Sequence, residues 1–399
     1  MNVRLTPARL QGSVAPPLSK SDAHRLLIAA ALSDREALIH LQSGNDDIAS
    51  TLRCLCALGA QVIQVEDGLR MRPICSPQEM PLLNCGESGS TLRFIAPIAA
   101  ALRGAVMTGS GRLGERPMEP LLSLLRAHGC EVSGEGLPLR IVGGLQNGVY
   151  ALRGDISSQF VSGLLYALPL LAGDSEIHLT TPLQSKGYVD MTLRALRRFG
   201  VAITEKENGF YVPGGQRYKA PEEELRPEGD WSGAAFWYGA NYLGCNVNIA
   251  GLDADSTQGD KEIARLVQRL PDVIDVADIP DLLPILSVMA CKKTGETRFV
   301  NAARLRIKES DRLDGCEKMI VNLGGSAYAK ADSLTVHGSG ALLGGTVDGR
   351  NDHRMVMAAA IASCICAEPV VIWGAQAVNK SYPDFFRDFE QLGGKIHVL

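Results

Sequence analysis

The stretch Leu52–Val65, LRCLCALGAQVIQV, decides the fold. A helix-like run ends at Gly59, and a strand-like run in which apolar and polar residues alternate follows at once. A glycine just past a helix readily takes the left-handed conformation that closes the last helical carbonyls, and alternation is typical of a half-buried strand. The stretch therefore predicts a helix, a glycine cap and a strand in direct succession.

The same joint recurs in four other stretches, LLRAHGCEV, LRRFGVAI, MIVNLGGSAY and FEQLGGKIHV, whose first glycines are Gly129, Gly200, Gly324 and Gly393. The first three joints are 70 and 71 residues apart and the last two are 69 apart. The gap of 124 residues between them has room for one altered unit, for which LVQRLPDVIDV is the candidate. Four joints lead into hairpin-like sequences, VEDGLRMR, SGEGLPLRI, KENGFYV and KADSLTV. Chance recurrence of a common joint is the alternative interpretation.

Six units of helix and strands predict an α/β protein, because one unit cannot bury its apolar face alone and three could form a domain. Two pseudo-symmetric domains of three units each would then meet near the Pro- and Glu-rich stretch Ala220–Gly229. A cleft between two such halves is the natural place for a ligand.

Composition narrows the class of protein. The 399 residues carry 40 Lys and Arg against 44 Asp and Glu, so nothing suggests broad attraction to nucleic acid or to an anionic membrane. The ten cysteines include no C-x-x-C pair and indicate a reducing compartment. The N-terminus has no apolar signal core, and the longest low-polarity run, Met355–Ala367, is too short to span a bilayer. We therefore expect a cytoplasmic protein that binds no nucleic acid and no membrane.

Basic residues gather at or near the predicted starts of helices and turns: Lys20, Arg25, Arg116, Lys308, Arg312, Arg354 and Lys380. Helix N-termini add free N–H groups and a positive dipole end to such charges. A strongly positive site in a protein of net charge −4 fits a pair of anionic substrates. Capped helices with solvated basic residues are the alternative for each cluster.

Polar clusters without strong charge lie beside these residues. Asn84–Arg93 places small residues and Gly89 before a helix, which favours an anion-binding nest. Asp155–Phe160 contains Ser157, Ser158 and Gln159, and Ser185 and Tyr188 form another cluster; each could be only a helix cap. Gly109, Gly111 and Gly114 match G-x-G-x-x-G, but Glu115-Arg116-Pro117 stands where a dinucleotide fold needs its helix.

Two acids complete the set of candidates. Asp281 lies among apolar residues at a Pro-marked turn, and Glu309 adjoins Lys308, where alternation predicts a strand with Arg304, Arg306 and Lys308 on one side. A helix cap and a surface ion pair are the alternatives for these two acids. Metal-ligand patterns and the G-x-S-x-G elbow are not found in the sequence, so we expect no metal site.

These clusters, in this order, resemble the 5-enolpyruvylshikimate-3-phosphate synthase family along essentially the whole chain. The segments that carry the resemblance are LSKSDAHR, NCGESGSTLR, GERPMEPLL, SSQFVSGLL, SKGYVDMTL, PDLLPILSVMA, LRIKESDRL, NDHRMVMA and KSYPDFF. The resemblance implies two domains of three βαβαββ-type units (an inside-out α/β barrel) with the active site in the interdomain cleft. It also implies that the N-terminal strand joins the C-terminal half, giving a discontinuous domain of residues 1–14 plus 226–399 and a second domain of residues 15–225.

The resemblance implies an enzyme of aromatic amino acid (chorismate) biosynthesis, a monomer that needs no cofactor. This transferase moves the enolpyruvyl group of phosphoenolpyruvate to the 5-hydroxyl of shikimate 3-phosphate and releases phosphate. Asp281 would take the hydroxyl proton, while Glu309, with Lys20, would handle the methylene proton. The residues expected to hold shikimate 3-phosphate are Lys20, Ser21, Arg25, Ser157, Ser158, Gln159, Ser185, Tyr188, Asp281 and Lys308. Those expected to hold phosphoenolpyruvate are Lys20, Gly89, Arg116, Gln159, Arg312, Arg354 and Lys380.

Two residues depart from the family pattern: Arg304 stands where some members have Asn, and Gly187 where some have Pro. The related UDP-N-acetylglucosamine enolpyruvyl transferase would have a loop Cys where this chain has Gly111. A non-catalytic anion-binding protein on the same scaffold would lack the acids, whereas Asp281 and Glu309 are both present. Because Gly89 leaves room beside the donor site, we also expect inhibition by glyphosate, a slightly longer mimic of phosphoenolpyruvate.

Overall fold

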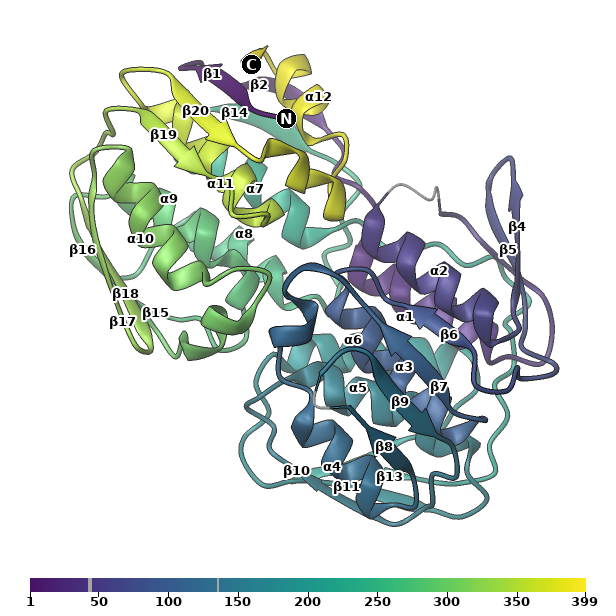
Figure 1. Ribbon diagram of the computed structural model, residues 1–399. Coiled ribbons are helices and arrows are strands. Elements are labelled where there is room, and N and C mark those ends of the chain that lie inside the picture. The colour runs from purple at the N-terminus through teal and green to yellow at the C-terminus, as the bar shows by residue number, and fades with distance from the viewer. Residues whose placement is uncertain (42–44, 135) are drawn as a thin grey trace. The chain divides into compact units, whose positions relative to one another are not determined.

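A computed structural model describes residues 1–41, 45–134 and 136–399 of the chain. The chain divides into two compact units (Figure 1). Unit 1 consists of Met1–Ser19 and Glu228–Leu399, and unit 2 consists of Lys20–Pro227. Both units mix helices and strands throughout, so the chain has an α/β fold.

Unit 2 contains six α-helices among its described residues: α1 (Lys20–Ala31), α2 (Asp46–Leu58), α3 (Gly89–Ala101), α4 (Glu119–Ala127), α5 (Ser158–Ala167) and α6 (Lys186–Arg198). Two short 3₁₀-helices are η1 (Gly111–Glu115) and η2 (Leu168–Leu170). Its strands are β3 (Ala37–Ile39), β4 (Gln61–Val65), β5 (Gly68–Arg72), β6 (Leu82–Asn84), β7 (Ala105–Thr108), β8 (Glu131–Ser133), β9 (Leu139–Val142), β10 (Val149–Leu152), β11 (Ser175–Leu179), β12 (Thr204–Lys206) and β13 (Gly209–Val212).

Unit 1 has the α-helices α7 (Trp231–Tyr242), α8 (Ile263–Leu266), α9 (Leu283–Lys292), α10 (Arg312–Asn322), α11 (His353–Ala362) and α12 (Phe385–Gln391). Its 3₁₀-helices are η3 (Gly259–Glu262), η4 (Pro280–Leu282), η5 (Ala303–Ile307), η6 (Ser363–Ile365) and η7 (Ala375–Lys380). Its strands are β1 (Val3–Thr6), β2 (Gln11–Val14), β14 (Asn246–Ile249), β15 (Val273–Asp275), β16 (Gly295–Val300), β17 (Ser326–Lys330), β18 (Ser333–Gly338), β19 (Gly345–Asp348), β20 (Val370–Trp373) and β21 (Lys395–Val398).

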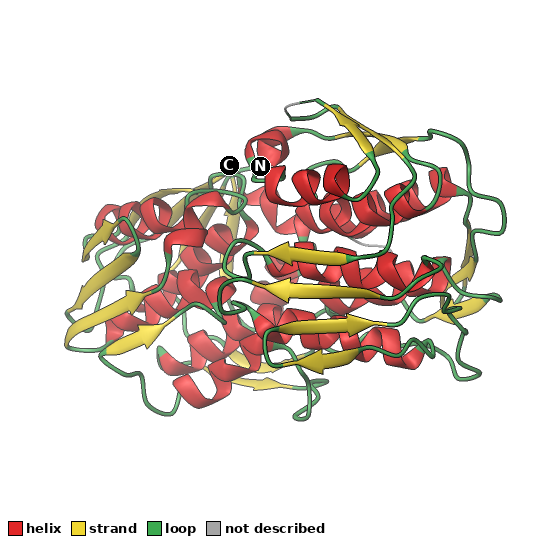
Figure 2. Ribbon diagram, turned by 90° about the horizontal axis from the view of Figure 1, so that it is seen from below, coloured by secondary structure: helices red, strands yellow, loops and turns green. Residues whose placement is uncertain are grey.

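Helices form the core of each unit, and sheets flank them (Figure 2). In unit 2, α3 and α5 are buried along nearly their whole lengths and pack against each other. In unit 1, α7, α9 and α11 are largely buried and contact one another. Such helices are apolar on nearly all sides because no face meets water. Many strands instead alternate buried and exposed residues, as strands with one solvated face do.

Four of the sheets share one topology. Their orders are β6-β7-β9-β8, β10-β11-β13-β12, β15-β16-β18-β17 and β19-β20-β1-β21. In each sheet the first two strands are parallel and the remaining pairs are antiparallel. The last of these sheets takes β1 from the N-terminus of the chain, which ties that terminus to the C-terminal segment.

The predicted glycine caps and hairpins are confirmed. All five joint glycines have positive φ, from +71° at Gly200 to +117° at Gly59. The four predicted hairpins are the antiparallel pairs β4/β5, β8/β9, β12/β13 and β17/β18. Residue 135, in SGEGLPLRI, lies outside the described residues.

The stretch LVQRLPDVIDV differs from the other joints. Its helix, α8, is only four residues long, and its strand β15 pairs in parallel with β16 at the start of the next sheet. Pro271 blocks any helical continuation there. Strands β14 and β2 of unit 1 pair in parallel as a two-stranded sheet. No helix of the described ranges is both long and apolar enough to cross a membrane.

Candidate functional site

In unit 2 the N-termini of α3 and α5 meet through one side-chain amide. Gln159, in the first turn of α5, donates from its amide nitrogen to Ser90 Oγ of α3 at 2.9 Å. Its amide oxygen accepts from Arg93 Nη1 at 2.9 Å, and Arg93 Nη2 donates to Pro117 O at 2.8 Å. The start of α3, the start of α5 and the turn before α4 are therefore held as one surface.

Gly89 and Arg116 make the closest approach in this group. A Cβ built on Gly89, the first residue of α3, would lie 2.6 Å from Arg116 Nη1 and 2.8 Å from Cζ. The Arg116 guanidinium thus lies against the N-terminus of α3, with the side chain only 9% exposed. A guanidinium and free helix N–H groups together favour an anion at this position.

Lys20 and Arg25 of α1 have different surroundings. Lys20 Nζ pairs with Asp47 Oδ2 at 2.9 Å, and Thr91 of α3 donates to the Asp47 carbonyl at 3.5 Å. Arg25 is buried: its Nε donates to Thr192 Oγ1 at 2.9 Å and its Nη2 donates to Tyr188 O at 2.7 Å. Burial lowers the pKa of Arg25 from its ordinary value. Arg25 therefore joins α1 to the first turns of α6.

The serine clusters stand at helix starts, as predicted. Ser157 caps α5, and its Oγ accepts from Gln159 N at 3.3 Å. Ser185 precedes α6 with φ +58°, a left-handed conformation that is uncommon outside glycine. Ser157, Ser158 and Ser185 are all less than 10% exposed. Their hydroxyls lie at the N-terminal ends of α5 and α6, where the first backbone N–H groups of a helix have no partner within the helix.

In unit 1 the starts of three helices converge on Arg312. This fully buried first residue of α10 donates from Nε to Asp352 Oδ2 at 2.8 Å and from Nη1 to Asp281 Oδ1 at 2.6 Å. Its Nη2 donates to Glu309 Oε2 at 2.8 Å. Burial opposes the charge of Arg312, but the carboxylates of Asp352, Glu309 and Asp281 raise its pKa well above the ordinary value.

Asp352 completes the buried side of this network. It caps α11, accepting from Arg354 N at 3.0 Å, and accepts a hydrogen bond from Ser310 Oγ at 2.9 Å. Burial acts to raise the pKa of Asp352, but the charge and hydrogen bond of Arg312, together with His353, hold this pKa below the ordinary value. Asp352 therefore fixes the orientation of the Arg312 guanidinium.

Asp281 faces three cations from three different segments. Its Oδ1 lies 2.6 Å from Arg312 Nη1 and 3.6 Å from Lys308 Nζ, and its Oδ2 lies 3.0 Å from Arg354 Nη2. Burial lowers the pKa of Lys308 to about 8, although the negative charge of Asp281 opposes this shift. This arrangement can accept a proton at Asp281 and hold anions with the surrounding cations.

The structure places the predicted site residues in two groups. Unit 2 holds Lys20, Ser21, Arg25, Gly89, Arg116, Ser157, Ser158, Gln159, Ser185 and Tyr188, and unit 1 holds Asp281, Lys308, Glu309, Arg312, Arg354 and Lys380. Lys380 ends η7 and donates to Asn351 O at 2.7 Å, next to Asp352.

The predicted strand through Arg304, Arg306 and Lys308 is wrong. Residues 303–307 form η5, a 3₁₀-helix, in which backbone carbonyls from distant parts of the chain hold the two arginines. Arg304 Nη2 donates to Ala277 O at 2.8 Å, and Arg306 Nη2 donates to Lys330 O at 2.5 Å. The alternation of charged and apolar residues in this short stretch therefore does not reflect a strand.

Sequence reasoning did not single out Asp47, Arg93 or Asp352 as site residues. Each acts on a predicted residue across a gap in the sequence: Asp47 on Lys20, Arg93 on Gln159, and Asp352 on Arg312. The available signal was the neighbourhood of Asp352, which precedes an apolar helix in NDHRMVMA and so suggests a cap.

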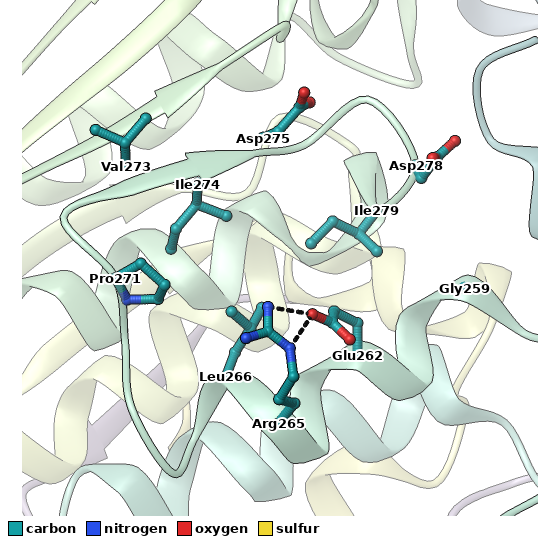
Figure 3. A pocket seen from close by; sticks show the side chains of 10 residues that line it. All are labelled: Gly259, Glu262, Arg265, Leu266, Pro271, Val273, Ile274, Asp275, Asp278 and Ile279. Atoms are coloured by element: carbon teal, nitrogen blue, oxygen red, sulfur yellow. Dashed lines mark hydrogen bonds and ion pairs between the residues drawn. The ribbon is translucent and has the colours of Figure 1, made fainter.

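A pocket of about 400 Å³ lies elsewhere in unit 1 (Figure 3). It is lined mainly by residues of η3, α8, β15 and the segment before η4, and the predicted site residues are not among them. Glu262 and Arg265 form an ion pair beside its apolar residues. Within the described parts of the chain, His, Cys, Asp and Glu side chains form no cluster of three or more that could hold a metal ion.

Comparison with known proteins places these groups in context. The family model described as EPSP synthase (3-phosphoshikimate 1-carboxyvinyltransferase) matches residues 5–389. The chain is 41% identical over 418 residues to the 3-phosphoshikimate 1-carboxyvinyltransferase of Clostridium kluyveri, covering 99% of this chain and 98% of the relative. It is 40% identical over 422 residues to the protein of the same name from Clostridium acetobutylicum, with the same coverage.

Among solved structures, EPSP synthase from Acinetobacter baumannii is similar with a TM-score of 0.81 at 24% identity, and the match covers 100% of both chains. At this identity the likeness concerns the fold, which is the same mixture of helices and sheets.

Proposed function

The chain belongs to the EPSP synthase family, and from this premise we propose how its residues carry out the family's reaction. The enzyme is a 3-phosphoshikimate 1-carboxyvinyltransferase: it transfers the enolpyruvyl group of phosphoenolpyruvate to the 5-hydroxyl of shikimate 3-phosphate and releases phosphate, in aromatic amino acid biosynthesis. One observation carries the assignment of roles. A single carboxylate, Asp281, lies within 3.6 Å of Lys308, Arg312 and Arg354, which is a base set among anion-binding cations.

The chemistry requires an acid–base pair and no cofactor. In the addition step the 5-hydroxyl oxygen bonds to C2 of phosphoenolpyruvate and loses its proton, while C3 gains a proton. The tetrahedral intermediate then loses a proton from the new methyl group as the C2–O bond to phosphate breaks. Protons balance over the two steps, and the products are the enolpyruvyl ether and inorganic phosphate. General acid–base groups and fixed positive charge lower the barrier of both steps.

We assign the proton transfers to three residues. Asp281 takes the hydroxyl proton, since its oxygens are directed at cations that a bound anion would also engage. Glu309, which is held by Arg312 Nη2 at 2.8 Å, acts with Lys20 on the methylene proton. The Lys20–Asp47 ion pair fixes the position of the lysine ammonium group from which a proton would be delivered.

We assign substrate binding to the helix starts of both units. Shikimate 3-phosphate is held by Ser21, Arg25, Ser157, Ser158, Gln159, Ser185, Tyr188 and Lys308, together with Lys20 and Asp281. Phosphoenolpyruvate is held by Gly89, Arg116, Arg312, Arg354 and Lys380, together with Lys20 and Gln159. Supporting this, Gln159 and Arg116 both lie against the N-terminus of α3. The proposal requires both groups of residues to act on one pair of substrates.

At the level of the fold we propose two pseudo-symmetric domains of three βαβαββ-type units, an inside-out α/β barrel with the active site between the domains. The support is the shared topology of four sheets and the burial of helices in place of strands. The proposed domains are residues 1–14 plus 226–399 and residues 15–225. We further propose that the enzyme is a cytoplasmic monomer.

The test of the function is phosphate release by the purified protein. Release should require both phosphoenolpyruvate and shikimate 3-phosphate, and the organic product should carry one enol ether per phosphate released. UDP-N-acetylglucosamine in place of shikimate 3-phosphate should give no release. Release with that acceptor, or none with shikimate 3-phosphate in a folded protein that binds it, would contradict the proposal.

A further inference from the structure

Asp260 is a buried carboxyl group in unit 1 that the proposed mechanism does not use. It lies in η3 and is 2% exposed. Its Oδ2 accepts a hydrogen bond from the Ser232 hydroxyl in the first turn of α7. Its Oδ1 is buried and, among the described residues, has no hydrogen-bond partner. A carboxylate with one bare oxygen in a buried place is unstable unless nearby charge supports it.

The segment that carries Asp260 is bonded to the start of α7 and packs against the residues just before Asp281. Gln258 accepts from Trp231 N at 3.1 Å and donates to Gly229 O at 2.8 Å, so η3 is tied to the start of α7. A Cβ on Gly259 would lie 3.0 Å from the carbonyl of Asp278, just before η4. Figure 3 shows Gly259 and Asp278 at the same border of the pocket.

The charged groups that act on Asp260 come from three elements. Burial raises the pKa of Asp260 to about 6, Asp281 of η4 and Asp230 at the cap of α7 raise it, and Arg354 of α11 lowers it. The other charges of η3 and α8 have partners elsewhere: Lys261 Nζ donates to Ser256 O at 2.7 Å, and Glu262 pairs with Arg265 at the pocket. Among the neighbouring charges, Asp281 and Arg354 therefore act most strongly on the pKa of Asp260.

The three cations on Asp281 pose a problem for a general base. Arg312, Arg354 and Lys308 stabilise its ionised form and so weaken its hold on a proton. A second negative charge nearby has the opposite effect, and the interaction between two carboxyl groups is mutual.

We propose that Asp260 is a positioning residue for the reaction: when ionised, its buried carboxylate strengthens Asp281 as a base and holds Arg354 in place, without touching either substrate. This inference rests on the proposed function. Ionisation of Asp260 should therefore increase kcat as the pH rises, with a midpoint near the Asp260 pKa of about 6.

The test compares kcat of the parent protein and Asp260→Asn from pH 5 to pH 8.5, with both substrates saturating. At pH 5 Asp260 is protonated in the parent, so the two rates should be nearly equal. Above pH 7 the parent should be faster by a factor of about 2 to 10, since strengthening a base by up to about one pK unit speeds proton transfer by at most about tenfold. The ratio of the rates should itself titrate with a midpoint near 6.

Two further variants separate this effect from a structural one. Glu262→Gln removes a charge from the same turn but at the pocket, and its ratio to the parent should not change with pH. Ser232→Ala removes the hydrogen bond that lowers the pKa of Asp260, so the inflection in kcat should move to higher pH. This second variant keeps the inference testable even if Asp260→Asn folds poorly.

A ratio for Asp260→Asn that is the same at every pH would overturn the inference, as would an unmoved inflection in Ser232→Ala. Both failures need an active parent protein. A parent that releases no phosphate from both substrates would instead contradict the proposed function.

Discussion

Arg312 and Asp352 form a fully enclosed ion pair, with Arg312 Nε 2.8 Å from Asp352 Oδ2 and both side chains at 0% exposure. The pair joins the first residue of α10 to the cap of α11. Nη1 of the guanidinium donates to Asp281, and Nη2 is shared between Glu309 at 2.8 Å and Asp352 Oδ1 at 3.3 Å. Asp281 and Glu309, the acids proposed to act in catalysis, are therefore oriented by one buried cation, whose own position depends on Asp352.

Asp352→Asn should destabilise the protein strongly, because it leaves the Arg312 charge buried with its fully buried partner neutralised. Breaking a buried pair in this way costs about 3 kcal/mol or more in free energy of unfolding. Ser310→Ala, which removes only a hydroxyl donor to Asp352, should cost about 1 kcal/mol. Urea unfolding of the three proteins measures both values. Equal stability of the Asn variant and the parent would show that the pair does not organise this region.

Gly89→Ala should weaken the binding of phosphoenolpyruvate and of glyphosate. The added methyl group would meet Arg116 Nη1 at 2.6 Å, and the flexible end of the arginine side chain would move away. Losing one charge-assisted contact raises KM for phosphoenolpyruvate about tenfold, at little cost to stability. The inhibition constant of glyphosate should rise with it.

Gly114→Ala is the matched control for that change, since a Cβ there meets no atom within 4 Å. It should leave KM and inhibition at the parent values. If Gly89→Ala is inhibited by glyphosate as strongly as the parent, the steric explanation is refuted.

Binding of shikimate 3-phosphate should weaken above pH 8. The pKa of Lys308 is about 8, so raising the pH through that value removes its proton and its attraction for an anion. KM for shikimate 3-phosphate should therefore rise between pH 7 and pH 9, whereas the phosphate itself has its second pKa near 6 and keeps its charge. In Lys308→Arg the charge persists, and the rise should be absent. A parent KM that is flat over this range would contradict the role given to Lys308.

As the pH rises, the lowered pKa of Lys308 affects protein stability in the opposite direction from substrate binding. The unfolded lysine keeps its proton up to a pKa of about 10.4, while the folded one releases it near 8. Between these values the unfolded state binds more protons, so the contribution of Lys308 to stability increases with pH. Weaker substrate binding at pH 9 would therefore not reflect unfolding caused by this group.

The sequence predicted those parts of the fold that depend on local rules. The joint at Gly59 and the start of α3 beside Gly89 follow from glycine conformation, helix capping and periodicity over a few residues. The 3₁₀-helix at Ala303–Ile307 could not be predicted in this way. Its arginines bond to carbonyls of Ala277 and Lys330, which tertiary structure alone brings near.

The site residues likewise divide into those that the local sequence indicates and those that only the tertiary structure brings together. Arg312 and Asp281 could be proposed from the sequence because their segments carry the family motifs. The partners that control them are distant in the chain: Asp352 is 40 residues from Arg312, and the coupling of Asp260 to Asp281 depends on the packing of η3 against the segment before η4. A buried charge requires a partner, but the sequence does not say which residue supplies it.

The most direct test of the account is phosphate release by Asp281→Asn with both substrates saturating. The amide keeps the shape of the side chain between Arg312 and Arg354 but cannot take the hydroxyl proton. Asp275→Asn, an exposed position on β15, serves as the control and should retain the parent rate. The kcat of Asp281→Asn should fall by a factor of about 100 or more, while shikimate 3-phosphate still binds. A variant that releases phosphate at the parent rate would contradict the assignment of Asp281 as the base.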